Sequence, residues 1–131
     1  ADVTGSTLAY TPPAGTTRVV FTFGCQVSYK DTNAISHWKL FLDSDEVTAF
    51  RRSASASIGE IFHSLSWIFT IGGSAVTATG VVESWGSAKT IKLQSREFGS
   101  SNEAELHTTT NFDGGASAIV VPPTISIKAI K

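Results

Sequence analysis

Three acidic side chains within four positions are the first candidates for chemistry in this chain. Asp43, Asp45 and Glu46 follow an apolar alternating run in the segment "ISHWKLFLDSDEV". Clustered carboxylate oxygens can bind calcium, but the EF-hand spacing of Gly and Glu is absent. Asp and Ser also bond to nearby backbone groups in tight turns. We therefore predict the tip of a β-hairpin, with a weak cation site or catalytic carboxylates as the alternatives.

The three histidines, His37, His63 and His107, lie on different predicted strands and form no close pair in the sequence. Neighbouring strands can bring such residues together, and a cupin-like metal enzyme would need them to converge with an acid. Zinc requires about four well-placed ligands, and Cys25 is the only cysteine. We predict no metal site, and we expect Cys25 to be a small buried hydrophobic residue rather than a nucleophile.

Motifs of the common enzyme classes are absent from the sequence. The chain contains no G-x-S-x-G elbow, no P-loop and no G-x-G-x-x-G pattern. The sequence alone does not exclude a pair of catalytic carboxylates like that of a glycosidase, although the glutamates are scattered and lie in no motif. We predict that the protein is not an enzyme and uses no cofactor.

Two aromatic residues lie beside small and polar residues, where they can contact a partner. Trp85 occurs in "VVESWGSAKT" and Phe112 in "NFDGG", next to Asn111 and Asp113. An exposed ring in such a place can stack on a sugar or fill a subunit interface, although the sequence favours burial in the core for each ring. Trp85, Asn111, Phe112 and Asp113 are the predicted binding residues.

Hydrophobic alternation with a period of two predicts the strands that position these residues. In "TRVVFTFGCQVSY" the odd-numbered residues from Val19 to Tyr29 are apolar, as in a long strand with one buried face. Further alternating runs follow in residues 37–42, 60–73, 89–98, 104–112 and 123–131, and they place Trp38 and Trp67 on the apolar side.

Clusters of Gly, Pro, Asp and Asn separate these runs, and no segment has a convincing helical pattern. The sequence therefore predicts an all-β fold, an antiparallel jelly-roll sandwich of about 8–10 strands. Its 131 residues fit a single domain. We expect residues 1–6 to be a linker from an upstream region. Because the chain begins with Ala, we also expect processing or a longer parent chain.

Composition excludes several classes of protein. Hydrophobic residues make up 41% and charged residues 16% of the chain, which is typical of a globular domain rather than a disordered one. The formal net charge of −1 argues against a nucleic-acid binder, which would show a basic stripe. No apolar run approaches the roughly 20 residues that span a bilayer, so we predict no membrane insertion.

The order of the segments "TLAYTPPAGTTRVVFTFGCQVSY", "ISHWKLFLDSDEV", "WIFTIGG", "SWGSAKTIKLQSREFGSSNEAELHTTT" and "PPTISIKAI" resembles domains encoded by marine bacteriophages, especially those of cyanobacteria. Such domains are similar to virion fibre or appendage proteins. The long first strand, the "WKLFLDSDEV" hairpin and the "IKLQSRE" strand also resemble, more distantly, the jelly rolls of the complement and tumour-necrosis-factor superfamily. The ending "ISIKAIK" lacks the aromatic residues common there, which weakens the expectation of similar packing at a trimer axis.

The resemblance implies a jelly-roll domain on a phage particle, outside the cell. It implies a homotrimer that contacts other virion proteins and, through exposed loops, a glycan or receptor on the host surface. The alternative function is a carbohydrate-binding, lectin-like module that uses the predicted binding residues.

Overall fold

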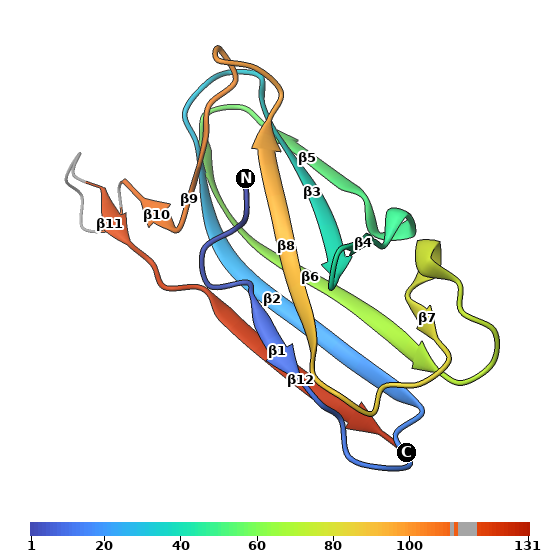
Figure 1. The fold of residues 1–131 in the computed structure, drawn as a ribbon. Coiled ribbons are helices and arrows are strands. Elements are labelled where there is room, and N and C mark those ends of the chain that lie inside the picture. Colours follow the sequence, from blue (N-terminus) through green and yellow to red (C-terminus); the bar gives the residue numbers. More distant parts are fainter. Residues whose placement is uncertain (111, 113–117) are drawn as a thin grey trace.

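The computed structural model describes residues 1–110, 112 and 118–131. Within this part the chain forms strands and two single turns of 3₁₀ helix, and it contains no α-helix (Figure 1). The strands, in chain order, are β1 (Leu8–Tyr10), β2 (Arg18–Tyr29), β3 (Ala34–Leu42), β4 (Asp45–Glu46), β5 (Arg52–Ala56), β6 (Gly59–Ile71), β7 (Val81–Val82), β8 (Lys89–Glu97), β9 (Ala104–Leu106), β10 (Thr108–Thr109), β11 (Ile119–Val120) and β12 (Thr124–Ile130). The 3₁₀ turns are η1 (Thr48–Phe50) and η2 (Thr77–Thr79).

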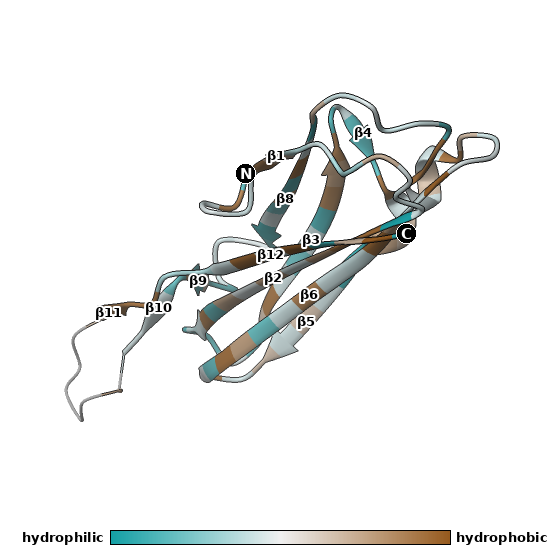
Figure 2. Cartoon of the chain, turned by 90° about the horizontal axis from the view of Figure 1, so that it is seen from below, coloured by the Kyte–Doolittle hydropathy of each residue, from teal (hydrophilic) through white to brown (hydrophobic). Residues whose placement is uncertain are grey.

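Two five-stranded sheets make the body of the domain. In sheet A, β3 pairs with β8, β4 and β5, and β1 adds to the outer edge of β8. In sheet B, the long strand β2 pairs with β6 on one side and with β12 and β9 on the other, and β7 adds to β6. Viewed from below, β8 and β3 form one layer, and β12, β2 and β6 form the other (Figure 2).

The prediction of an all-β sandwich is confirmed, with two differences in detail. The described residues form twelve strands rather than 8–10, because four of them have only two residues and give no alternating pattern to detect. The pairing of β6 with β7 is parallel, whereas the other strand pairs are antiparallel. The finer assignment to a jelly roll stays a prediction.

The core fills the space between the sheets, and β2 contributes most to it. All six apolar odd-numbered residues from Val19 to Tyr29 are buried, as the alternation predicted. From sheet A, Trp38, Leu40, Leu42, Ile91 and Leu93 face them and are also buried. Fully burying a side chain of this size stabilises a fold by about 1.5–3 kcal/mol, so this inner layer holds the two sheets together.

The alternating pattern in β6 and β12 correctly predicted which side chains face the opposite sheet. Those side chains are less buried than the pattern led us to expect. Phe69 is buried, whereas Ile61 and Ile125 are exposed, although their cross-strand partners Val27 and Phe23 are buried. Both strands lie toward the margins of sheet B, where the opposite sheet covers them less. On the β5 side, the inward residues Ala54 and Ala56 are small and leave much of β6 uncovered.

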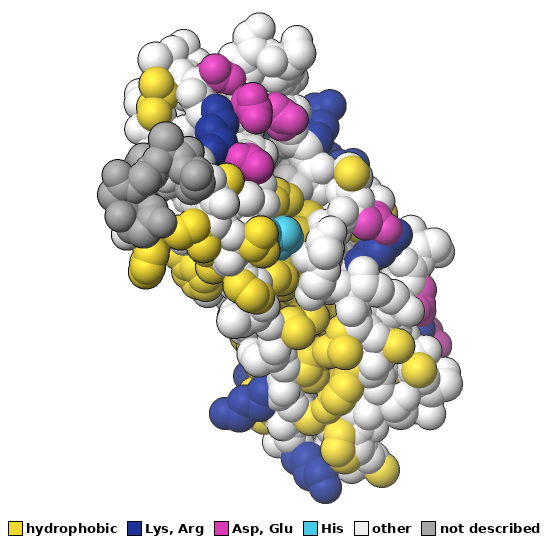
Figure 3. All heavy atoms as spheres, turned by 90° about the vertical axis from the view of Figure 1, so that its left-hand side faces the viewer, with side chains coloured by type: hydrophobic (Ala, Val, Ile, Leu, Met, Phe, Trp, Pro, Cys, Tyr) yellow, Lys and Arg dark blue, Asp and Glu magenta, His cyan; other side chains and the backbone are white. Residues whose placement is uncertain are grey.

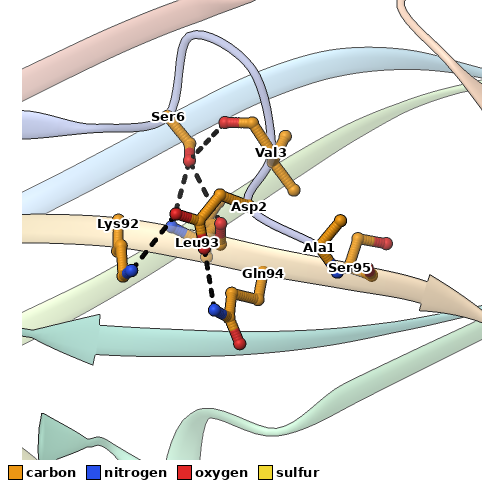
Figure 4. A network of polar contacts seen from close by, with 8 residues as sticks. All are labelled: Ala1, Asp2, Val3, Ser6, Lys92, Leu93, Gln94 and Ser95. Atoms are coloured by element: carbon orange, nitrogen blue, oxygen red, sulfur yellow. Dashed lines mark hydrogen bonds and ion pairs between the residues drawn. The ribbon is translucent and has the colours of Figure 1, made fainter. Parts of the chain in front are cut away.

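Residues 1–6 are packed against β8 and do not behave as a linker, contrary to the expectation (Figure 4). Ala1 and Ser95 exchange two backbone hydrogen bonds of 2.9 Å, and the Asp2 carboxylate accepts hydrogen bonds from Lys92 and Gln94. Val3 is buried. The segment therefore covers one edge of sheet A as part of the domain.

Ser6 anchors the same segment from inside. It is fully buried, its hydroxyl donates to the Val3 carbonyl at 2.8 Å, and the Leu93 N–H donates to its oxygen at 3.0 Å (Figure 4). A buried N–H without a partner is costly, and Ser6 supplies that partner.

A two-stranded ribbon, β10 with β11, projects from one side of the sandwich (Figures 1 and 2). Glu60 at the start of β6 ties it to sheet B, because its carboxylate accepts hydrogen bonds from the hydroxyls of Thr109 and Thr110 and from the Thr110 N–H. The ribbon is therefore anchored at its base by a charged group.

Candidate functional site

The acidic cluster forms the tip of a hairpin, as predicted. Residues 43 and 44 connect β3 to β4, which pair through Leu42 with Asp45 and Phe41 with Glu46. Asp43 has a left-handed backbone, with φ of 56°, a conformation that Asp tolerates better than most residues. Strand β4 has only two residues, and η1 follows it directly.

Two of the three carboxylates in this tip are bonded to cationic or backbone groups. Glu46 accepts from Arg51 Nε at 2.7 Å and from Lys39 Nζ at 3.0 Å, and these two cations lower its pKa to about 2. Asp43 accepts from the Thr90 N–H at 2.8 Å and from Lys89 at 3.2 Å, which also lowers its pKa. The tip is thus a structural element of sheet A.

The three histidines do not share one site. His37 lies on the outer face of sheet A, where its Nδ1 lies 2.8 Å from the Ser53 hydroxyl. His63 points between the sheets, and its ring packs against Tyr29 and Trp38. His107 packs edge-on against Phe23 beyond β9. Within residues 1–110, 112 and 118–131, no three His, Cys, Asp or Glu side chains gather in a way that could hold a metal ion.

His63 belongs to a polar chain that crosses the core between the sheets. Its Nε2 lies 2.8 Å from the Tyr29 hydroxyl, which lies 3.0 Å from the Ser36 hydroxyl. The Trp38 indole donates to the same serine at 3.0 Å. Burial lowers the pKa of His63. The chain joins β2 and β6 of sheet B to β3 of sheet A, and it provides partners for polar groups that would be costly to bury alone.

Cys25 is fully buried in the middle of β2, as expected. Burial raises the pKa of its thiol to about 12. Because the thiolate is the reactive form of cysteine, this position favours a packing role.

Trp85 is buried, the environment that the sequence favoured, so its ring is not exposed for the binding role also predicted for it. Only 4% of the residue is accessible, and its indole donates to the Tyr10 carbonyl at 2.9 Å. Its ring packs edge-on against Tyr10 and Phe69. Here the loop folds back over the open end between β1 and β6, so the small neighbours in sequence did not indicate exposure.

Phe112 is 82% exposed, as predicted for a contact residue. The other two predicted binding residues, Asn111 and Asp113, lie outside the described residues. The ring of Phe112 is therefore the only described part of the predicted loop site, and its role as a binding residue stays a prediction.

A groove on the outer face of sheet A, which the sequence analysis missed, has a cavity volume of about 520 Å³. The cationic side chains of Lys39, Arg51 and Arg96 line it together with His37, and no acidic residue lines it. Arg52 also borders it, but its guanidinium lies over the rings of Phe50 and Trp67 on the inner side of the sheet. We call it the sheet A groove. It forms because strand register brings distant residues together.

Register aligns the residues of the groove in two rows. His37 on β3 pairs with Ser53 on β5 and with Arg96 on β8, so these three form one row across the sheet. The next row pairs Lys39 with Gln94. Arg96 is exposed, and the described residues offer it no ion-pair partner.

Phe98 borders the groove just beyond β8. It is 67% exposed, and its ring centre lies 6.3 Å from that of His37. An exposed aromatic ring beside cationic groups is a common feature of binding sites. The sequence offered no signal for Phe98, because only the pairing of β8 with β3 reveals what lies beside it.

The outer face of sheet B is different in kind. On β6, Phe62 and Ile68 are 55% and 51% exposed, and they alternate with inward residues. The positions around the centre of this face carry no charge, and they are Val20, Thr22, Gly24, Gln26, Ser64, Ser66, Thr124 and Ser126. The Phe62 ring lies over Gly24, where an added Cβ would come within 2.6 Å of its tip.

Hydrophobic side chains also gather along the side of the sandwich where β11 and β12 lie (Figure 3). Val120 and Ile125 are among the exposed residues there. The described residues contain no apolar helix of membrane-spanning length.

Comparisons with protein-family models, with curated proteins and with solved structures found no match to this chain.

Proposed function

We propose that this domain is a structural part of a virion, a trimeric fibre or a capsid or tail appendage domain of a phage particle that takes part in attachment to the host surface. The observation that carries the proposal is the exposed Phe62 and Ile68 on the outer face of sheet B, whose central positions carry no charged side chain. Exposed apolar patches of this kind are typical of protein contact sites. The resemblance of the quoted segments to phage appendage domains supports the virion as the location.

A second copy of the same chain fits this face. The centre of the face carries no charge, so copies of it can approach without like-charge repulsion. A closed ring of subunits would bury Phe62 and Ile68 in every subunit and leave no apolar patch exposed to solvent. The jelly-roll assignment belongs to the same proposal, since such domains pair two sheets and assemble readily.

The test is the mass of the protein in solution. Sedimentation equilibrium at micromolar concentration should give three times the chain mass of 13.8 kDa. A protein that stays monomeric over this range would overturn the trimer and with it the fibre role. Immunogold labelling of purified particles, if the parent phage is isolated, should then place the domain on the virion surface.

The second candidate function is a carbohydrate-binding module. The exposed Phe98 ring beside the sheet A groove favours it, in addition to Phe112. The two functions are compatible, because an appendage domain can bind host glycans. A glycan array with no bound sugar would remove this second function and leave the structural proposal intact.

A further inference from the structure

We propose that the sheet A groove is a binding site for an acidic saccharide, with the oxyanion held by Arg96 and Lys39 and a sugar ring stacked on Phe98. This deepens the proposed function, on which it rests, by naming the class of host-surface ligand and the residues that recognise it.

The charge of the groove calls for an anion. The cationic side chains of Lys39, Arg51 and Arg96 line it, and no carboxylate does. Glu46 partly neutralises Lys39 and Arg51 from the side, at 3.0 and 2.7 Å. Arg96 has no such partner among the described residues, so its guanidinium is available to bind a carboxylate or sulfate in a bidentate manner.

The wall of the groove also contains a polar atom that the described part of the protein does not satisfy. His37 Nδ1 lies 2.8 Å from the Ser53 hydroxyl, whereas His37 Nε2 is enclosed and has no hydrogen-bond partner. Unpaired buried polar atoms are rare in folded proteins and need an explanation. In the proposed complex the ring turns so that this nitrogen bonds to the ligand.

Phe98 favours a saccharide as the molecule that bears the acidic group. Its ring is exposed next to His37, two residues beyond Arg96 and on the same face of the sheet. The apolar face of a sugar ring packs on such an aromatic surface while its polar groups reach the side chains around it. The volume of about 520 Å³ lies within the range of small-ligand sites.

The surroundings disfavour an extended polyanion such as a nucleic acid. Asp2, held by Lys92 and Gln94, and Glu46 lie beside the groove, so its positive charge is local. A nucleic-acid backbone needs a continuous basic track. The groove suits a compact ligand with a single acidic group on a short saccharide.

Calorimetric titration of the whole protein with three matched tetrasaccharides tests the proposal. The probes are galactose tetrasaccharides that carry one carboxylate (a galacturonate unit), one sulfate or no charge. We expect binding of one or both acidic probes, at least about tenfold tighter than the neutral probe, since a charge-assisted hydrogen bond is worth roughly 1.5–3 kcal/mol. The stronger acidic probe identifies whether the natural oxyanion is a carboxylate or a sulfate.

Variants distinguish binding in the sheet A groove from nonspecific attraction by positive charge. Arg96→Gln should weaken acidic binding by about tenfold or more, and Phe98→Ala should weaken it even at high salt, where ionic contacts are screened. Lys128→Gln removes the same charge from sheet B and should leave binding unchanged. Both substituted groove residues are exposed, so thermal unfolding should show that these variants still fold.

Three outcomes would overturn the inference. The first is that neither acidic probe binds at millimolar concentration. The second is that Arg96→Gln and Lys128→Gln weaken acidic binding equally. The third is that a single-stranded oligonucleotide binds as tightly as the saccharides. The mass of the same samples keeps the two proposals apart. A trimer without saccharide binding contradicts only the groove, and a monomer that binds the acidic saccharide contradicts only the assembly.

Discussion

The outer faces of the two sheets differ more than their similar frameworks would lead one to expect. Sheet A carries four of the five ion pairs among the described residues, and its groove is lined by cations. Sheet B presents Ser, Thr and Gly around exposed Phe62 and Ile68. Both faces are attached to the same core. The difference is consistent with the two proposals, in which one face binds a charged ligand and the other contacts protein.

The largest effect should come from the shared core. Phe21→Ala removes a fully buried ring between the sheets, and we expect it to lower the free energy of unfolding by about 3–5 kcal/mol. Chemical denaturation measures this loss, and assembly and saccharide binding should weaken together. Thr22→Ala, the adjacent outward position on β2, is the control and should change stability by no more than about 0.5 kcal/mol. A cost below about 1 kcal/mol for Phe21→Ala would mean that the two sheets do not depend on a common core.

The next largest effect should distinguish the outer face of sheet B from that of sheet A. The double variant Phe62→Ser and Ile68→Ser should raise the dissociation constant of the oligomer by about 100-fold or more, because each apolar side chain loses its burial in the contact. Sedimentation velocity measures the change. Phe98→Ser, which removes an equally exposed ring beside sheet A, should leave the oligomer intact. Equal losses in the two variants would show that the faces are not specialised.

A smaller effect tests how the N-terminal segment is held on sheet A. Ser6→Ala leaves the buried Leu93 N–H without its partner, and we expect a loss of about 1–3 kcal/mol. Hydrogen exchange should show faster opening of β8 than of β6. The exposed Thr4→Ala is the control. If β6 opened as much as β8, the segment would support the whole sandwich rather than one sheet.

The smallest effect is the acid response of the hairpin tip. The Arg51 and Lys39 cations lower the pKa of Glu46 from an ordinary 4.5 to about 2. The stabilisation is therefore complete above pH 4.5 and is lost as the pH falls toward 2. Glu46→Gln should flatten the fall in melting temperature over this window, because it removes the titrating group.

Glu83→Gln serves as the matched control for that acid titration, since it removes a carboxylate away from these two cations. It should retain the wild-type acid response. A Glu46→Gln profile identical to that of the wild type would mean that the ion pairs of the tip do not contribute to folding.

Much of the framework was predictable because alternation is a local property. The buried row of β2 and the inward Trp38, Leu40 and Leu42 of β3 follow from period two alone, and the hairpin at Asp43 follows from turn chemistry. Residues 1–6 were misjudged because their burial depends on β8, which lies some ninety positions away. Trp85 was ambiguous for the same reason, since its partners are Tyr10 and Phe69.

The sequence by itself determined the class of fold and the side of each long strand that faces inward, because side chains alternate strictly along a strand. Only the tertiary structure decided which outward residues meet. His37, Ser53 and Arg96 form one row because β3 pairs with β5 and β8 in a particular register. That register is set by contacts between segments far apart in the chain, and a shift of one residue would turn each of these side chains to the other face.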